Sequence, residues 1–170
     1  MNADFYILMV LFIYMPFHFF GEAMGDFPSW MYKHWTPFHL SYGHWMANNI
    51  FLFYPLLVVS FLIHYFMPQM ISFFGGGILV WGIINFGDHA FYTVKDKKIS
   101  TGLWTGIIYL INSFCGFRAL WLENRINVVI VMLSVIMGIF LFMTPIISAK
   151  YIGKTFMKRF GMPVEEIDAK

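Results

Sequence analysis

Histidine and acidic side chains recur in this chain at a helical spacing. His18 and Glu22 lie four residues apart, and so do Asn85 and His89. Side chains at positions i and i+4 share one face of an α-helix. A histidine and a carboxylate one turn apart can ligate a metal ion, act as an oriented acid–base pair, or hydrogen-bond each other and hold helices together.

Further polar residues extend both groups. We predict four catalytic residues, two of them adjacent in sequence: His18, Glu22, Asp88 and His89. Four more are predicted to support them, namely His44 and Asn48, which repeat the spacing of four, together with Asn85 and Tyr92. If a metal is bound, the predicted ligands are His18, Glu22 and His89. Two histidines and one or two carboxylates suit Zn²⁺ or Fe²⁺ as well as a proton relay.

The remaining histidines have weaker claims to a functional role. His34 and His39 lie in the aromatic stretch from Trp30 to Tyr42, which is typical of a belt at a membrane interface. His64 is predicted to contact lipid headgroups. The run Gly75-Gly76-Gly77 lacks the lysine and hydroxyl residue of a phosphate loop, so it predicts close helix packing or a flexible helix.

Composition places these polar residues in a membrane protein. The chain of 170 residues is 59% hydrophobic and 12% charged, whereas a soluble domain is about 25% charged. These figures exclude a disordered chain and a typical cytosolic enzyme. The net charge of +2 is too small to indicate nucleic-acid binding, and the single cysteine, Cys115, excludes an intrachain disulfide.

Uncharged runs predict the helices. They span residues 5–21, 34–87, 99–117 and 126–149. Since a bilayer crossing needs about 20 residues, we predict an all-α membrane helix bundle over residues 1–149, with helices at about 5–23, 45–66, 70–92, 102–121 and 127–149. Pro68 and Gln69 mark a turn. The first helix carries Pro16 and is short, so the alternative to a membrane-spanning helix is a re-entrant or interfacial one. No basic segment precedes it, which favours a retained helix over a signal peptide.

Basic residues predict the orientation, because loops on the cytoplasmic side are rich in lysine and arginine. Placing the C-terminus inside puts nine of the eleven basic residues in the cytoplasm and the N-terminus outside. The loop at Lys95–Lys98 then faces the cytoplasm too. Residues 150–170 are predicted to form a cytoplasmic basic tail, whose first part, Lys150 to Arg159, fits either a basic amphipathic segment on the membrane surface or a topology anchor.

This orientation gives each polar residue a depth. All eight predicted site residues fall at the cytoplasmic level, where Thr101, Trp104 and Thr105 also open the fourth helix. His64 follows His44 by 20 residues, or about 30 Å along a helix, so it is predicted at the opposite face.

The motifs at this level resemble those of the HXXEE-domain family of small bacterial membrane proteins. The matching segments are His18-Phe19-Phe20-Gly21-Glu22, Pro28-Ser29-Trp30, Asn85 with His89, and Lys98 followed by Thr101-Gly102-Leu103-Trp104-Thr105. The chain departs from the family pattern at three positions: Gly21 replaces the first glutamate, Ile99 replaces a tyrosine and Thr101 replaces a proline. Because the first helix therefore lacks one of the two acids, Asp26 or Asp88 could supply the second. The resemblance implies the choice of site residues and a bacterial cytoplasmic membrane.

Three functions fit these observations. The leading hypothesis is a membrane enzyme acting on a lipid or isoprenoid-like substrate at the cytoplasmic interface, by metal-assisted hydrolysis or acid–base isomerisation. The second is a proton- or ion-coupled transporter. Two observations argue against it: the chain has no obvious inverted repeat, and its polar residues gather at one face. A homodimer could supply the transport path. The third is a non-catalytic partner or lipid-binding subunit. The predicted partners are membrane lipids and a lipophilic small molecule.

Overall fold

The computed structural model describes residues 1–67 and 71–162, and within them the chain is helical without a β-strand. The predicted all-α bundle is therefore confirmed. The predicted turn at Pro68 and Gln69 and the end of the predicted tail lie outside the described residues. In chain order, with η for π-helix, the elements are α1 (Ala3–Ile13), η1 (Tyr14–Phe19), α2 (Phe20–Met24), α3 (Phe27–His34), α4 (Tyr42–Asn48), η2 (Asn49–Phe53), α5 (Tyr54–Phe66), α6 (Phe73–Asp96), α7 (Leu103–Leu122) and α8 (Val128–Arg159).

Four of the described helices are long and apolar enough to cross a membrane: Ala3–Met24, Tyr42–Phe66, Leu103–Leu122 and Val128–Arg159. Helix α6 is the fifth long helix of the bundle. Its 24 residues extend about 36 Å, but it contains three glycines in a row and the charged residues Asp88, Lys95 and Asp96. All residues from Gly75 to Gly82 are buried, so the other helices rather than lipid surround this part of α6.

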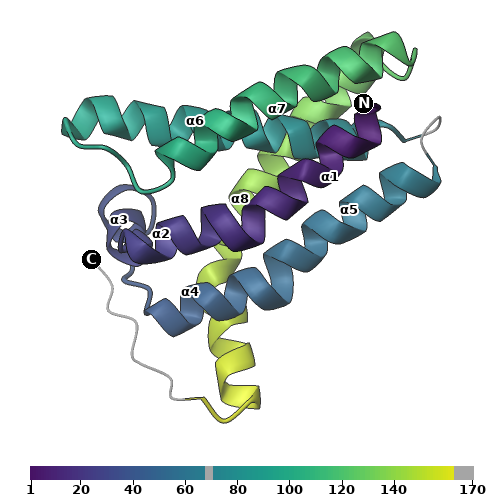
Figure 1. Cartoon of the computed structure of the whole chain (residues 1–170). Helices are drawn as coiled ribbons and strands as arrows, with labels where there is room; N and C mark the ends of the chain where they lie inside the picture. Colours follow the sequence, from purple (N-terminus) through teal and green to yellow (C-terminus); the bar gives the residue numbers. More distant parts are fainter. Residues whose placement is uncertain (68–70, 163–170) are drawn as a thin grey trace.

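The long helices give the bundle two ends with different contents. Helix α6 packs most extensively against α7 and α8, and α1 packs against α7. In Figure 1, α3 and the turn between α6 and α7 lie at one end, while the N-terminus and the turn between α7 and α8 lie at the other. Segments η1, α2 and α4 thus bring His18, Glu22 and His44 to the same end as the last turns of α6.

Small residues allow the close crossing of α6 and α8. A Cβ at Gly77 would lie 2.5 Å from Cγ of Met137, and one at Gly138 would lie 2.4 Å from a methyl carbon of Val80. A Cβ at Gly76 would lie 2.1 Å from the hydroxyl of Ser134. The predicted close helix packing at the glycine run is therefore confirmed, as expected where apolar association depends on van der Waals contact.

Two π-helical segments interrupt the first two long helices, and each is associated with a proline. Pro16 lies within η1, and Pro55 follows η2. A proline removes one helical N–H and clashes with the carbonyl four residues before it, and a π-turn lets a neighbouring N–H reach that carbonyl. The two segments are joined because the Tyr14 hydroxyl donates a hydrogen bond to Oδ1 of Asn49. Proline thus shapes the helices next to His18.

A short helix, α3, covers the end that contains His18 and includes the first part of the aromatic stretch from Trp30 to Tyr42. Asp26 adopts a left-handed conformation (φ 55°) between α2 and α3. Helix α3 is anchored to the last residue of α6: Nζ of Lys33 and Nε2 of His34 lie 2.7 and 2.9 Å from Oδ2 of Asp96. Burial lowers the pKa of His34 although Asp96 raises it, so at neutral pH Lys33 supplies the positive charge of this anchor.

Helix α8 continues beyond the predicted boundary at residue 149. Its residues Ala149, Gly153 and Met157 are buried, and a Cβ at Gly153 would lie 2.3 Å from the carbonyl oxygen of His44. The ring of Phe156 stacks on Phe51 at 4.7 Å between centroids. Residues 150–159 are therefore packed on α4 and η2, and they are not a free tail.

The opposite end holds a charged network that includes His64. Its Nε2 lies 3.1 Å from Oδ1 of Asp4 and 2.7 Å from Nη2 of Arg125. Arg125 also reaches Asp4 and Glu123, both at 2.9 Å. The predicted position of His64, far from the other polar residues, is confirmed. The predicted headgroup contact is wrong, because the His64 side chain is fully buried among protein groups.

Candidate functional site

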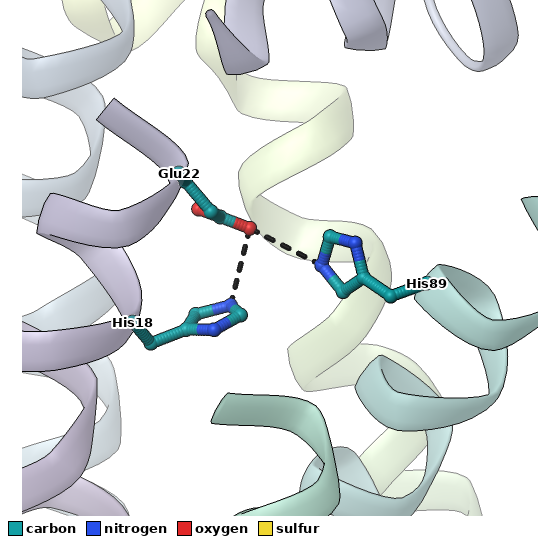
Figure 2. Close-up of side chains that lie close together, drawn as sticks. All are labelled: His18, Glu22 and His89. Atoms are coloured by element: carbon teal, nitrogen blue, oxygen red, sulfur yellow. Dashed lines mark ion pairs between the residues drawn. The ribbon is translucent and has the colours of Figure 1, made fainter. Parts of the chain in front are cut away.

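Three buried side chains from two helices meet at one point (Figure 2). Oε1 of Glu22 lies 3.1 Å from Nε2 of His18 and 3.4 Å from Nε2 of His89. The two imidazole rings are 5.6 Å apart between centroids. All three side chains are at least 96% buried. We call these residues the His–Glu–His cluster; the last turns of η1, α2 and α6 position them.

Neighbouring groups fix which nitrogen of His18 carries its proton. The Thr105 hydroxyl donates to the carbonyl of Gly102 at 3.0 Å, so its oxygen accepts from Nδ1–H of His18, 2.6 Å away. This contact leaves the lone pair on Nε2. Nδ2 of Asn85 lies 3.2 Å from the same nitrogen, so its N–H competes with any other partner for that lone pair. An imidazole held in this way, with Nδ1 bonded to the protein and a lone pair on Nε2, has the arrangement found in metal-ligating histidines.

His89 is held by a hydrogen bond and by packing on both sides. Its Nδ1 lies 2.8 Å from the hydroxyl of Ser100, and the ring of Trp30 stacks on it at 5.2 Å. Gly102 packs against its other edge, where a Cβ would lie 2.3 Å from Nε2. The loop between α6 and α7 and helix α3 therefore together aim Nε2 of His89 at Glu22.

The cluster needs a positive charge at its centre. A carboxylate oxygen and the lone pair of Nε2 of His18 are both acceptors, and at 3.1 Å they repel unless a proton or a metal ion lies between them. Two ligands of a tetrahedral ion with bonds of 2.0–2.1 Å are about 3.3 Å apart. The two contacts to Glu22 match this value, and one ligand atom from each residue lies within 4.8 Å of the others. The three residues can therefore hold one divalent ion.

A small cavity adjoins the cluster. All three cluster residues line it, and most of the remaining wall is aromatic: Tyr14, Phe27, Trp30, Trp35, Trp45, Phe53, Trp81 and Phe142. Small-molecule sites are mostly apolar with a few polar groups. The arrangement presents one polar point to an otherwise aromatic chamber.

The structure separates the predicted site residues into two groups. His18, Glu22 and His89 form the cluster, Asn85 contacts it, and Asp88 lines the same cavity. Asp88 is held apart from the cluster, since its carboxylate accepts a hydrogen bond from Nε1 of Trp35 at 3.1 Å. These five residues therefore surround one space, as the sequence predicts.

The other three predicted residues belong to packing contacts. His44 pairs with the hydroxyl of Ser41 at 2.6 Å, at the start of α4. Asn48 donates to the carbonyl of Pro145 and accepts from Ser148, so it joins α4 to α8. The ring of Tyr92 packs on His34, 4.0 Å away between centroids. These contacts of His44, Asn48 and Tyr92 are with residues outside the cluster, because depth in the bundle does not determine which way a side chain points.

Three residues that orient the cluster are absent from the set predicted from sequence: Trp30, Ser100 and Thr105. The sequence places Thr105 at the right depth but gives it no role. Ser100 follows His89 by eleven residues across a loop, a separation with no periodic signal. Trp30 belongs to the Pro28-Ser29-Trp30 segment of the family resemblance, and that segment is the one signal in the sequence that points to it.

Comparison of the chain with protein-family models, with curated proteins and with solved structures finds no match. The resemblance to the HXXEE-domain family therefore stays a prediction from the motifs quoted above.

Proposed function

We propose that this protein is a membrane enzyme that uses a divalent metal ion, held by His18, Glu22 and His89, to hydrolyse a lipophilic substrate. The observation that carries the proposal is the convergence of two imidazole nitrogens and one carboxylate oxygen on the wall of an aromatic cavity. Catalytic zinc sites have three protein ligands of these types and an open fourth position.

The residues present fit a metal in charge and in orientation. Glu22 supplies a negative charge in an apolar environment, which is costly without a cation. Thr105 holds His18 with a lone pair on Nε2, and Ser100 bonds Nδ1 of His89. A bound ion would act as a Lewis acid and lower the pKa of a water ligand. The protein would bind the ion, orient the substrate along the cavity and limit access of bulk water.

The cavity supports a lipophilic substrate. Its aromatic rings favour hydrocarbon or an extended π system, and its ionisable imidazole and carboxyl groups and its amide are confined to the cluster and to Asn85 and Asp88. The cavity is small. A slim chain suits this space better than a bulky ring system, which favours an acyl or isoprenoid chain.

The test is metal binding by protein purified in detergent, measured by elemental analysis and by titration with Zn²⁺ and Fe²⁺. We expect about one ion per chain for the wild type, by analogy with three-ligand catalytic sites. His18→Ala, Glu22→Gln, His89→Ala and the triple variant should lose binding to a similar extent, since groups that act as a unit are not additive.

His39→Ala is the matched control, because His39 is an exposed histidine of the same end of the chain. Its metal content should equal that of the wild type. A folded wild-type protein that binds neither ion would overturn the metal proposal and favour proton transfer between Glu22 and the two imidazoles. Equal metal loss in His39→Ala would show that the ion sits elsewhere.

A further inference from the structure

The cavity of the proposed function adjoins a groove on the outer surface of the bundle. Trp35, Asp88 and Phe142 line both spaces. The rest of the groove wall comes from α6: Ile84, Gly87, Phe91 and Tyr92. The shared side chains of Trp35, Asp88 and Phe142, which we call the partition, therefore separate the buried cluster from the surface beside α6.

The partition is held together by few contacts. It draws on three segments, since Trp35 follows α3, Asp88 belongs to α6 and Phe142 to α8. Nε1 of Trp35 donates one hydrogen bond to Asp88 at 3.1 Å, and its ring meets Phe142 edge-on at 5.5 Å. All three side chains are partly exposed. A rotamer change of Trp35 or Phe142 would join the two spaces.

Exposed and mostly apolar residues of α6 surround the groove. Gly87 is exposed, and a Cβ there would meet no atom within 4 Å. Phe91 and Val94, further along α6, are 59% and 78% exposed. The ammonium of Lys95 lies 5.8 Å from the ring centroid of Phe91 and 5.3 Å from that of Tyr92. Seven residues of helix separate Lys95 from Asp88, or about 10 Å. The groove thus has an apolar floor and a cation at its outer end.

A second route, from the aqueous end, is less direct. A polar hollow lined by Asp26, Lys33, Asp96 and Lys98 also lies at this end of the bundle. It shares a single lining residue, Trp30, with the aromatic cavity. Because the Trp30 ring stacks on His89, opening this route would disturb the cluster, whereas opening the partition would leave the cluster contacts in place.

We propose that the groove is a lateral portal, through which the hydrocarbon chain of an anionic membrane lipid passes the partition while its headgroup stays beside Lys95. The portal proposal depends on the proposed function in one respect, namely that the substrate occupies the cavity behind the partition. Its occupant is set by the apolar groove floor, by continuity with the cavity, and by the cation at the outer end.

The test is photo-crosslinking in nanodiscs, with phosphatidylglycerol that carries a diazirine in the middle of one acyl chain. Peptide mapping should find adducts on Trp35, Phe142 or residues of the aromatic cavity. Gly87→Phe fills the groove without a clash at Cβ, so these adducts should be lost. Gly21→Phe is the matched control: Gly21 is also exposed, and a Cβ there would meet no atom within 4 Å, but it lies on α2 outside the groove.

The headgroup is tested with a phosphatidylcholine probe of the same chain. Lys95→Glu should reduce labelling by phosphatidylglycerol several-fold and leave labelling by phosphatidylcholine unchanged, whereas Lys98→Glu, on the polar hollow, should change neither. If Lys95→Glu reduces labelling by both lipid probes equally, the proposed role of Lys95 is overturned. Undiminished partition adducts in Gly87→Phe, or wild-type adducts confined to the outer faces of α7 and α8, would overturn the portal.

Metal content distinguishes failure of the portal proposal from failure of the proposed function. Gly87→Phe should retain the wild-type metal content, because Gly87 does not contact the cluster. A wild type with partition adducts but no bound metal would leave the portal standing and remove the metal proposal. A wild type that binds metal, but whose partition adducts persist in Gly87→Phe, would remove the portal and leave the metal proposal standing.

Discussion

At the scale of single residues, the cluster depends on neighbours that supply no ligand atom. Glu22 is shared by His18 and His89, but the orientation of each imidazole comes from a hydroxyl group behind it. Hydrogen bonds of this kind select the tautomer and hold the ring in place. Thr105 and Ser100 are therefore positioning residues.

Thr105→Val should weaken metal binding by about 10–100-fold, the usual cost of removing a hydrogen bond behind a metal ligand. Valine keeps the shape of threonine but offers no acceptor to Nδ1–H of His18. The measurement is a competition titration with a chelator of known affinity. Thr105→Ser, which restores the hydroxyl, should recover most of the loss.

Thr101→Val is the control for this substitution, since the Thr101 hydroxyl is buried at the same end without a hydrogen-bond partner. Its metal affinity should stay close to that of the wild type. If Thr101→Val and Thr105→Val weaken binding equally, the effect comes from repacking of this end and not from the His18 tautomer.

At the scale of helices, the two ends of the bundle are fastened by different means. The covered end is built from rings, hydroxyl groups and the anchor of α3 on Asp96. The opposite end joins the start of α1, the end of α5 and the turn before α8 through Asp4, His64, Glu123 and Arg125. The backbone N–H of Ala3 also donates to Glu123 at 2.8 Å, so this network fixes where the first helix begins.

His64→Ala should lower the free energy of unfolding by about 1–3 kcal/mol, the cost of leaving buried polar partners unsatisfied. His64 is buried and contacts both Asp4 and Arg125, so its removal takes one partner from each of these two charged groups. Thermal unfolding in detergent, followed by circular dichroism, would measure the loss. His39→Ala, at an exposed position, should unfold as the wild type does.

The metal content of His64→Ala should be unchanged, because the network and the cluster occupy opposite ends of the bundle. Loss of metal together with normal stability would contradict this division. It would show that the network, and not the His–Glu–His cluster, holds the ion.

At the scale of the whole molecule, the cluster, the aromatic cavity and the groove all open towards the end where the basic residues gather. Lys33, Lys95 and Lys98 lie at this end, and the last turns of α8 carry Lys150, Lys154 and Lys158. The rule that basic loops remain inside predicts that the site faces the cytoplasm and that the network of Asp4 and Arg125 faces outside.

Cysteine labelling in intact bacterial cells tests this orientation, after Cys115 is replaced by alanine. Ile99→Cys and Lys158→Cys, both exposed at the site end, should react only with a membrane-permeant maleimide. Leu122→Cys, exposed at the end of α7, should react with an impermeant one. Impermeant labelling of Ile99→Cys with protection of Leu122→Cys would reverse the topology.

Much of this protein was determined by its sequence alone. Hydrocarbon tolerates few charges, so uncharged runs located the helices to within a few residues, except at the end of α8. The rarity of acids beside those runs singled out Glu22 and Asp88. The spacing of His18 and Glu22 is local to one helix and survives in the structure. The level shared by His18, Asn85 and His89 followed from helix length, since 1.5 Å per residue fixes depth.

Only the tertiary structure decided which of the residues at that depth meet. Depth leaves the rotation of each helix open, and rotation depends on which helices pack together. His44 and Asn48 face α8, where Gly153 admits the backbone of α4; His18 and His89 face each other because Gly102, Thr105 and Ser100 fill the space between α2, α6 and α7. Helix α3 and the packed end of α8 were likewise hidden, because their short amphipathic segments resemble interfacial ones until a partner surface is known.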